Sequence, residues 1–143
     1  MTRSFPTPQD AEAAFYEALE AGDLEAMMEV WADDEEVVCV HPGGPRIAGY
    51  EQVRDSWARI LSSGERLKVD LSEQVCLQGV MVSLHSLHES VSQGDEQRQV
   101  VVTTNVYLRT GGGCRMIAHH ASLASRVAPA PRPDAGDTPK TLH

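Results

Sequence analysis

Five side chains of types that bind ligands or move protons stand on segments with strand or helix character. They are His41, Trp57, Glu89, Asn105 and His120. A carboxylate on a half-buried strand can have a raised pKa, so Glu89, or alternatively His120, is expected to act as a general base. Asn105 or His41 would hold a developing oxyanion, and Trp57 would form an apolar wall with a polar N–H. This set would suit proton abstraction beside a carbonyl group.

Two adjacent histidines, His119 and His120, present a choice of face. Side chains alternate between the two faces of a strand, so one histidine should point into the domain and the other away from it. His120 shares its face with the small residues Ala118 and Ser122, which would leave room around an imidazole. The alternation therefore favours His120 as the inward histidine.

The same residues can also have a purely structural role, and the sequence leaves this alternative open. Trp31 and Trp57 stand on apolar helical stripes, where an aromatic side chain usually belongs to the core. A strand glutamate usually faces solvent, and buried Asn and His side chains commonly satisfy nearby backbone groups. His85 and His88 lie in a Ser-rich strand and are expected at the surface or in an interface.

Metal and cofactor chemistry receive little support. His41, Glu89 and His120 could form a two-His, one-carboxylate set, but nothing in their spacing requires it. The glycine run at 111–113 joins two strands and precedes no helix, unlike a phosphate-binding loop. The sequence therefore predicts no metal and no cofactor. Three cysteines without metal-ligand spacing are expected to be reduced core thiols: Cys39, Cys76 and Cys114.

Three helices are expected in the first half of the chain. Thr7 and Pro8 are typical of a helix start, and Gly22 is typical of its end. Asp23 caps a second short helix, and Gly49 opens a third. The first helix carries an apolar stripe of Ala11, Ala14, Phe15, Ala18 and Leu19.

Strands dominate the second half. An early strand at 37–41 ends in the turn cluster 42–45, and a meander of four long strands follows at 67–77, 80–91, 99–109 and 114–127. Helices segregated to one side of an antiparallel sheet define an α+β fold. We expect one domain over 1–128 and a Pro-rich, disordered tail at 129–143.

The charge distribution excludes some partners. The chain has a net charge of −9; residues 1–36 hold eleven acidic residues and one basic residue, and the rest is nearly balanced. Nucleic acid would require a basic stripe, and none is visible. No apolar run approaches the ~20 residues that span a bilayer, and the N-terminus lacks a secretory signal. We expect a soluble, cytoplasmic protein with no nucleic-acid or membrane partner.

Three strings resemble the SnoaL-like, ketosteroid-isomerase-like branch of the nuclear transport factor 2-like superfamily: VCVHPG at 38–43, TTNVYLR at 103–109 and MIAHHAS at 116–122. The resemblance covers roughly residues 8–126. It implies a cone-shaped fold, with a strongly curved antiparallel sheet packed on three N-terminal helices, often homodimeric through the outer sheet face. Two departures are Ala118, where related chains often carry a histidine, and Leu123, where a proline is common.

Members of that superfamily include isomerases, cyclases, hydrolases and binding modules, so the fold does not choose the function. One hypothesis is an isomerase- or cyclase-type enzyme acting on an apolar or carbonyl-bearing small molecule. A second is a non-catalytic ligand-binding or dimerisation module. A third is that the acidic N-terminal helices dock a basic partner.

Overall fold

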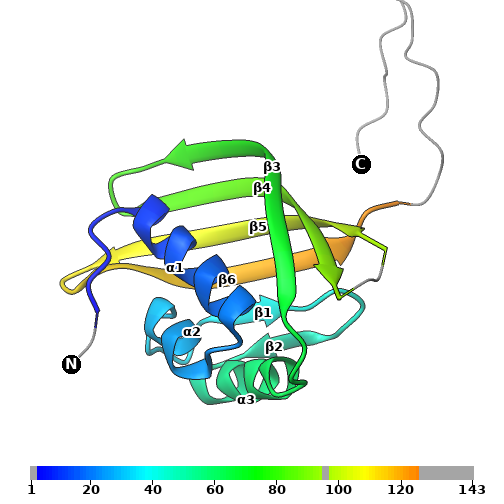
Figure 1. Cartoon of the computed structure of the whole chain (residues 1–143). Coiled ribbons are helices and arrows are strands. Elements are labelled where there is room, and N and C mark those ends of the chain that lie inside the picture. The colour runs from blue at the N-terminus through cyan, green and yellow to red at the C-terminus, as the bar shows by residue number, and fades with distance from the viewer. Residues whose placement is uncertain (1–2, 95–96, 126–143) are drawn as a thin grey trace, which may run out of the picture.

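The computed structural model describes residues 3–94 and 97–125. Three helices lie against one face of a curved, unclosed sheet of six strands (Figure 1). The sheet order is β2-β1-β6-β5-β4-β3. The helices are α1 (Pro8–Ala21), α2 (Leu24–Val30) and α3 (Tyr50–Leu61). The strands are β1 (Val38–Val40), β2 (Arg46–Ala48), β3 (Leu67–Gln78), β4 (Val82–Gln93), β5 (Gln99–Thr110) and β6 (Gly113–Leu123).

The predicted α+β cone is confirmed, with two refinements. Strands β3 to β6 form the expected antiparallel meander, but β1 pairs with β6 in parallel, so the sheet is mixed. The short strand β2 was not predicted, because three residues after a Gly-Pro turn carry too little periodicity to be recognised. Strand β6 ends at Leu123, earlier than predicted. The tail at 129–143 lies outside the described residues.

Helix α1 begins and ends where its sequence signals place it. The Thr7 hydroxyl accepts a hydrogen bond from the Asp10 backbone N–H at 3.0 Å, and the Asp10 carboxylate accepts one from the Thr7 N–H. This capping box satisfies two N–H groups that a helix start leaves free. Gly22 ends the helix in the left-handed conformation, with φ of 67°.

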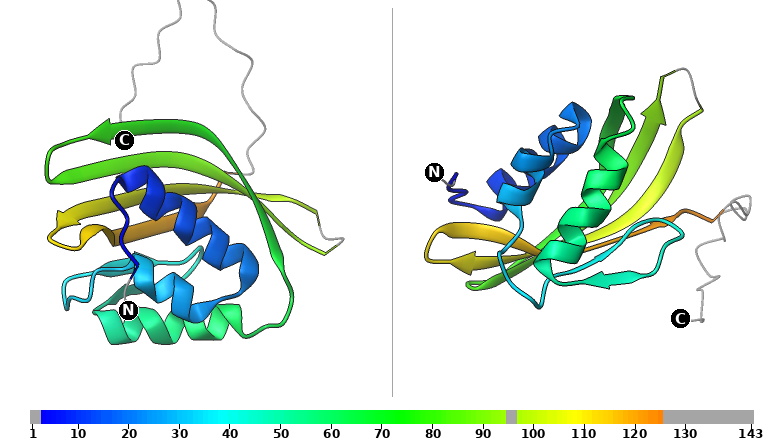
Figure 2. Two further views of the ribbon diagram at one scale, coloured as in Figure 1. Left: turned by 60° about the vertical axis from the view of Figure 1, so that its left-hand side comes forward. Right: turned by 90° about the horizontal axis from the view of Figure 1, so that it is seen from below.

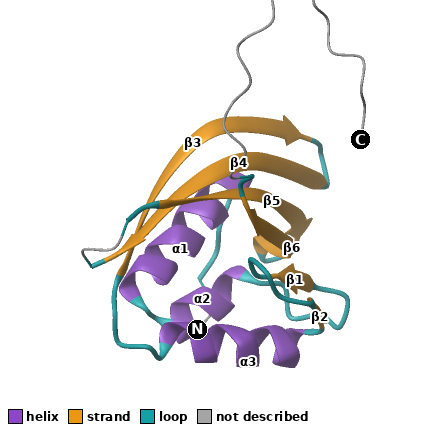
Figure 3. Ribbon diagram, turned by 90° about the vertical axis from the view of Figure 1, so that its right-hand side faces the viewer, coloured by secondary structure: helices purple, strands orange, loops and turns teal. Residues whose placement is uncertain are grey.

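Helix α1 crosses the inner face of the sheet, and its contacts form much of the core (Figures 2 and 3). Phe15 and Tyr16 are both buried, and their rings meet edge to face at 4.8 Å between centroids. Trp57 of α3 packs edge to face on Phe15. Among the described residues, none of the helices is long and apolar enough to cross a membrane.

A β-bulge in β6 changes which residues face the core. Val106 pairs with Ala118, whereas Tyr107 pairs with Met116, so Ile117 is an extra residue without a partner on β5. Before the bulge the even-numbered residues are buried; after it the odd-numbered ones are. A bulge inserts one residue and thereby reverses the alternation of faces.

The cysteines are free, as expected, but only two of them lie in the core. Cys39 and Cys114 are buried, and Cys76 is exposed on the edge strand β3. The expectation that all three are core thiols is therefore wrong for Cys76. Strand β3 has no neighbour on its outer side, so its apolar run is less covered than the runs of the inner strands.

Candidate functional site

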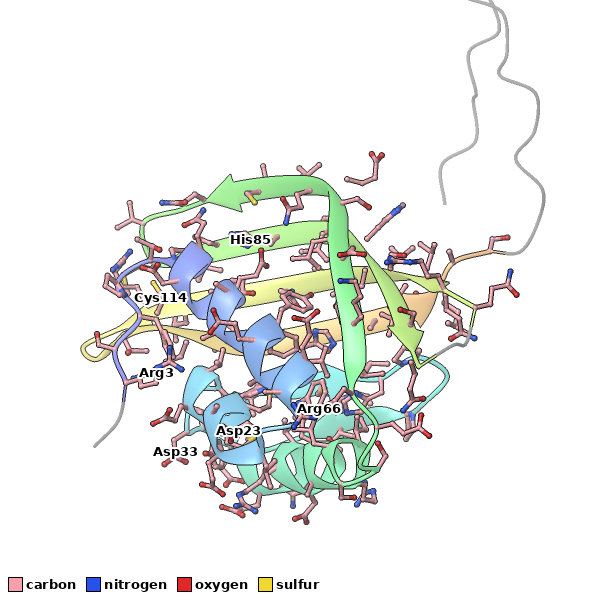
Figure 4. All side chains as sticks on the ribbon, in the orientation of Figure 1. Arg3, Asp23, Asp33, Arg66, His85 and Cys114 are labelled. Atoms are coloured by element: carbon pink, nitrogen blue, oxygen red, sulfur yellow. The ribbon has the colours of Figure 1, made fainter. Side chains whose placement is uncertain are left out.

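The inner face of the sheet carries a row of polar side chains that crosses several strands. His85 of β4 is directly opposite Asn105 of β5, and Asn105 is opposite His119 of β6. Cross-strand partners share a face, so these three side chains point into the same interior. Figure 4 labels His85 on β4, close to helix α1. His85 and Asn105 are fully buried, and His119 is 4% exposed.

Helix α1 supplies two further polar groups above this row. Glu12 and Tyr16 are four residues apart and therefore lie on one face of the helix. Both are buried, as is Glu89 of β4. We call seven connected side chains the polar network: Glu12, Tyr16, His85, Glu89, Asn105, Tyr107 and His119.

One half of the polar network is centred on the Glu12 carboxylate. Its Oε2 accepts hydrogen bonds from His85 Nδ1 at 2.9 Å, from the Tyr107 hydroxyl at 2.9 Å and from Asn105 Nδ2 at 3.5 Å. Removing the shared acceptor of several buried donors is costly, because the donors stay desolvated and without a partner. Glu12 is therefore a major structural link between helix and sheet.

The other half is a chain of hydrogen bonds. His119 Nδ1 donates to Asn105 Oδ1 at 2.6 Å, and Asn105 Nδ2 donates to the Tyr16 hydroxyl at 3.1 Å. The Tyr16 hydroxyl donates to Glu89 Oε2 at 2.5 Å. Because Nδ1 of His119 is the donor, Nε2 of the neutral ring carries the free lone pair. The hydrogen bonds that join these four residues, each from a different element, thus all donate in one direction, from His119 toward Glu89.

Burial alters the acidity of the Glu89 carboxyl. Desolvation raises the pKa of its carboxyl above the ordinary value, and the nearby Glu12 adds to this effect. The hydroxyls of Tyr16 and Thr103 act in the opposite direction. Thr103 acts by proximity, since its Oγ1 makes no hydrogen bond of standard geometry. Burial also raises the pKa of the Tyr16 hydroxyl, so Tyr16 remains a donor.

An aromatic cluster of Phe15, His41, Trp57 and His119 adjoins the polar network. The Trp57 ring lies 4.7 Å from the half-buried His41 ring and 5.8 Å from the His119 ring, centroid to centroid. His41 Nε2 donates to the Ser56 hydroxyl at 3.0 Å, which itself donates to the Val53 carbonyl.

Buried polar atoms without a partner lie at both ends of this interior. Trp57 Nε1 and His85 Nε2 are buried and make no hydrogen bond within the described part of the chain. Native structures contain few such groups, and each calls for an explanation. Two surface cavities, of about 430 and 230 Å³, are lined by other residues.

Comparison with known proteins places this arrangement in a family. The model of the SnoaL-like domain matches residues 9–126. The chain belongs to the SnoaL-like domain family. The resemblance inferred from sequence to the nuclear transport factor 2-like superfamily is thereby confirmed. None of the curated proteins compared with the chain matches it.

Solved structures agree with the assignment of this SnoaL-like domain. A candidate calcium/calmodulin-dependent protein kinase type II association domain from Thiobacillus denitrificans is 36% identical, with a TM-score of 0.77; the match covers 86% of this chain and 99% of that one. A candidate NTF2-like dehydratase from Streptomyces avermitilis is 31% identical, with a TM-score of 0.72; the match covers 80% of this chain and 91% of that one. A candidate ketosteroid isomerase from Parabacteroides distasonis shows the same fold, with 20% identity and a TM-score of 0.69. The match covers 85% of this chain and 90% of that one.

Four of the five side chains singled out from the sequence of the SnoaL-like domain are connected in the structure. Asn105 and Glu89 belong to the polar network, and His41 and Trp57 belong to the aromatic cluster. Asn105 already has partners on both its oxygen and its nitrogen, so it orients Tyr16 and His119 and is not free to hold an oxyanion.

Two histidine assignments were wrong. His120 is exposed and His119 faces the interior. His120 does share its face with the small residues Ala118 and Ser122, but beyond the bulge at Ile117 that face is the outer one. His85 is fully buried and not at the surface, because Glu12 supplies it with a buried partner. The two-His, one-carboxylate set cannot form, since His120 lies on the opposite face from Glu89.

Sequence reasoning missed Glu12, Tyr16 and the inward role of Tyr107. Glu12 stands among the eleven acidic residues of the first 36, and the charge distribution does not distinguish it from the others. Its spacing of four residues to Tyr16, directly beside the apolar stripe, is the signal that could have revealed both. One tyrosine and one acid on the core edge of a helix point to a buried polar contact.

The buried His119 should make the SnoaL-like domain sensitive to acid. Burial, with the nearby His41 and His120, lowers the pKa of His119 to about 3. An unfolded chain takes up this proton near pH 6.5, so the contribution of His119 is complete above pH 6.5 and is lost as the pH falls toward 3. Between pH 7.5 and 4.5 this loss is about 2–3 kcal/mol.

Urea unfolding of His119→Gln at these two pH values tests the prediction. The raised pKa of Glu89 has the opposite effect on stability, because it favours the folded state as the pH falls. The quantity to compare is therefore the loss of unfolding free energy between pH 7.5 and 4.5 in the variant and in the wild type. We expect the variant to lose less stability on acidification, and the exposed-site control His120→Gln to behave like the wild type. An unchanged loss in His119→Gln would contradict a buried neutral imidazole.

Proposed function

We propose that this SnoaL-like domain catalyses proton transfer next to the carbonyl group of a small molecule, as in an isomerisation or dehydration. The observation that carries the proposal is Glu89: a buried carboxyl with a raised pKa, held by the Tyr16 hydroxyl at 2.5 Å. A general base works best when its pKa lies near the working pH, and burial moves Glu89 in that direction. The 31% identical relative described as a candidate dehydratase supports this class of reaction.

The proposed roles follow from the hydrogen bonds. Glu89 takes the proton from the carbon beside the carbonyl, and the electron pair of the broken C–H bond moves onto the carbonyl oxygen. Protonated Glu89 is a weaker acceptor, so the Tyr16 hydroxyl can turn to donate to the new oxyanion. Glu89 then returns the proton to another carbon, or to a leaving hydroxyl group that departs as water.

His119 is the weaker candidate for the base. A conjugate acid with a pKa of about 3 binds a proton too weakly to remove one from carbon. Its Nδ1–H instead fixes Asn105, and Asn105 fixes the Tyr16 hydroxyl. We therefore assign His119 and Asn105 as positioning residues, and Trp57 Nε1, a buried donor without a partner, as a group that orients the ligand.

Proton exchange in deuterated water tests the proposed function without knowledge of the substrate. A panel of small ketones is incubated with the protein, and the loss of the proton signals beside the carbonyl is followed by NMR. We expect one or more ketones to exchange faster than in buffer alone, saturably with ketone concentration. If no ketone in a panel spanning linear, cyclic and aromatic compounds exchanges above the buffer rate, the proposal fails.

A second proposal, the alternative from the sequence, is that the outer sheet face forms a homodimer. Val75, Leu77, Val82, Val100 and Val102 are each at least 39% exposed there. The central cross-strand rows of this face contain no Lys, Arg, Asp or Glu: Leu84–Val106–Ala118, Ser86–Thr104–His120 and His88–Val102–Ser122. Large exposed apolar patches mark association sites. The relative described as a candidate association domain also supports the proposal that this domain associates.

Sedimentation of the full chain tests this surface. We expect a species of twice the 15.6 kDa chain mass, and a monomer in Val102→Glu, because two carboxylates would meet in the uncharged face. Gln52→Glu, at an exposed position on α3, serves as the control and should remain a dimer. A wild-type monomer at high micromolar concentration would refute the interface.

A further inference from the structure

The interior around the polar network has an unusual balance of charge. Among the described residues, the buried polar and charged side chains include two carboxylates, Glu12 and Glu89, and two histidines, His85 and His119, but no Lys or Arg. Buried charges are expensive and are normally paired with an opposite charge. The partners of Glu12 and Glu89 therefore decide how this buried charge is balanced.

Only one of the two carboxylates has a basic partner. Glu12 accepts a hydrogen bond from the His85 imidazole at 2.9 Å. His119 stays neutral, because burial holds its pKa at about 3. Glu89 is bonded to the Tyr16 hydroxyl, which carries no charge, and its pKa is raised. Glu89 is thus the uncompensated acid of the interior.

No Lys or Arg of the described chain is among the groups that shift the pKa of Glu89. Arg59 is close enough to lower the pKa of His41, but Arg59 is exposed and water screens it. Arg98 pairs with Asp70 in the exposed part of the sheet, and Arg54 pairs with Glu25. A ligand in the interior would therefore meet the Glu89 carboxyl with no fixed positive charge beside it.

We propose that the ligand of this site is a cationic carbonyl compound, one that carries a protonated amine, and that anionic compounds are rejected. This inference rests on the proposed function, since it assumes that the ligand reaches Glu89. An ammonium group would supply the missing countercharge in a low-dielectric interior. The rings of Phe15, Tyr16 and Trp57 pack together in the same interior, and aromatic faces attract cations.

Three ring ketones of matched size separate charge from shape. They are 4-(dimethylamino)cyclohexanone, its uncharged counterpart 4-isopropylcyclohexanone, and the anion 4-oxocyclohexanecarboxylate. Dissociation constants are measured by calorimetry at pH 7 with the full chain, and exchange of the protons beside the carbonyl is measured in parallel. We expect the cation to bind at least about tenfold tighter than the isopropyl compound, and the anion at least about tenfold weaker.

The Glu89→Gln variant removes the charge but keeps the shape, and circular dichroism verifies its fold. In this variant the preference for the cation over the isopropyl compound should fall to within about threefold. Equal binding of all three ketones by the wild type, tightest binding of the anion, or an unchanged preference in Glu89→Gln would each overturn the inference and leave the proposed function standing. If none of the three ketones binds or exchanges, but other ketones exchange, the inference fails alone; if no ketone exchanges at all, both fail.

Discussion

Replacing Glu89 with glutamine is expected to slow proton exchange beside the carbonyl of a bound ketone by about 10²–10⁴-fold. Glutamine preserves the shape of the side chain and can still accept a hydrogen bond from the Tyr16 hydroxyl, but it cannot take a proton. The exchange rate in deuterated water, measured by NMR at saturating ketone, is the readout.

A matched substitution separates the loss of chemistry from damage to the fold. Glu17→Gln on the exposed face of α1 removes one carboxylate from the same acidic surface and should exchange at the wild-type rate. An exchange rate in Glu89→Gln within threefold of the wild type would mean that another group is the base.

The second large effect concerns stability. Replacing Glu12 with alanine should lower the free energy of unfolding by about 3–5 kcal/mol. Three donors would lose their common acceptor: His85 Nδ1, the Tyr107 hydroxyl and Asn105 Nδ2. Each lies in the interior, where water cannot replace the carboxylate. Urea unfolding at neutral pH measures the change.

Two controls define this result. Glu12→Gln retains one acceptor oxygen and should be destabilised less than Glu12→Ala. Glu17→Ala, five residues further along the helix and on its exposed face, should stay within about 0.5 kcal/mol of the wild type. If Glu12→Ala unfolded at nearly the same urea concentration as Glu17→Ala, the buried carboxylate would not be the link between helix and sheet.

Much of the fold could be read from the sequence because its signals are local. Thr7, Pro8 and Gly22 bound the first helix exactly as their caps predict, and short turns separate four long strands that pair with their neighbours in sequence. The strand β2 is too short to show a periodicity, although it pairs with the nearby β1. The parallel pairing of β1 with β6 is not a local property, because it joins segments about 80 residues apart in the sequence, whose contact no nearby residue encodes.

The site was less predictable for a different reason. Counting alternate residues along β6 fails at one extra residue, Ile117, and this single insertion exchanges the roles of His119 and His120. A bulge has no sequence signature that distinguishes it from regular strand here. Similarly, His85 and Glu12 are each unlikely core residues on their own, and they are buried only because each provides the other with a partner.

The central claim is that Glu89 is a buried carboxyl with a raised pKa that accepts a hydrogen bond from Tyr16. Carbon-detected NMR of the glutamate carboxyl groups, assigned with Glu89→Gln, follows its titration directly. We predict a pKa above the ordinary value of 4.5, and a further increase in Tyr16→Phe, because the hydroxyl that favours the carboxylate is removed. A pKa at or below 4.5 in the wild type would contradict the account.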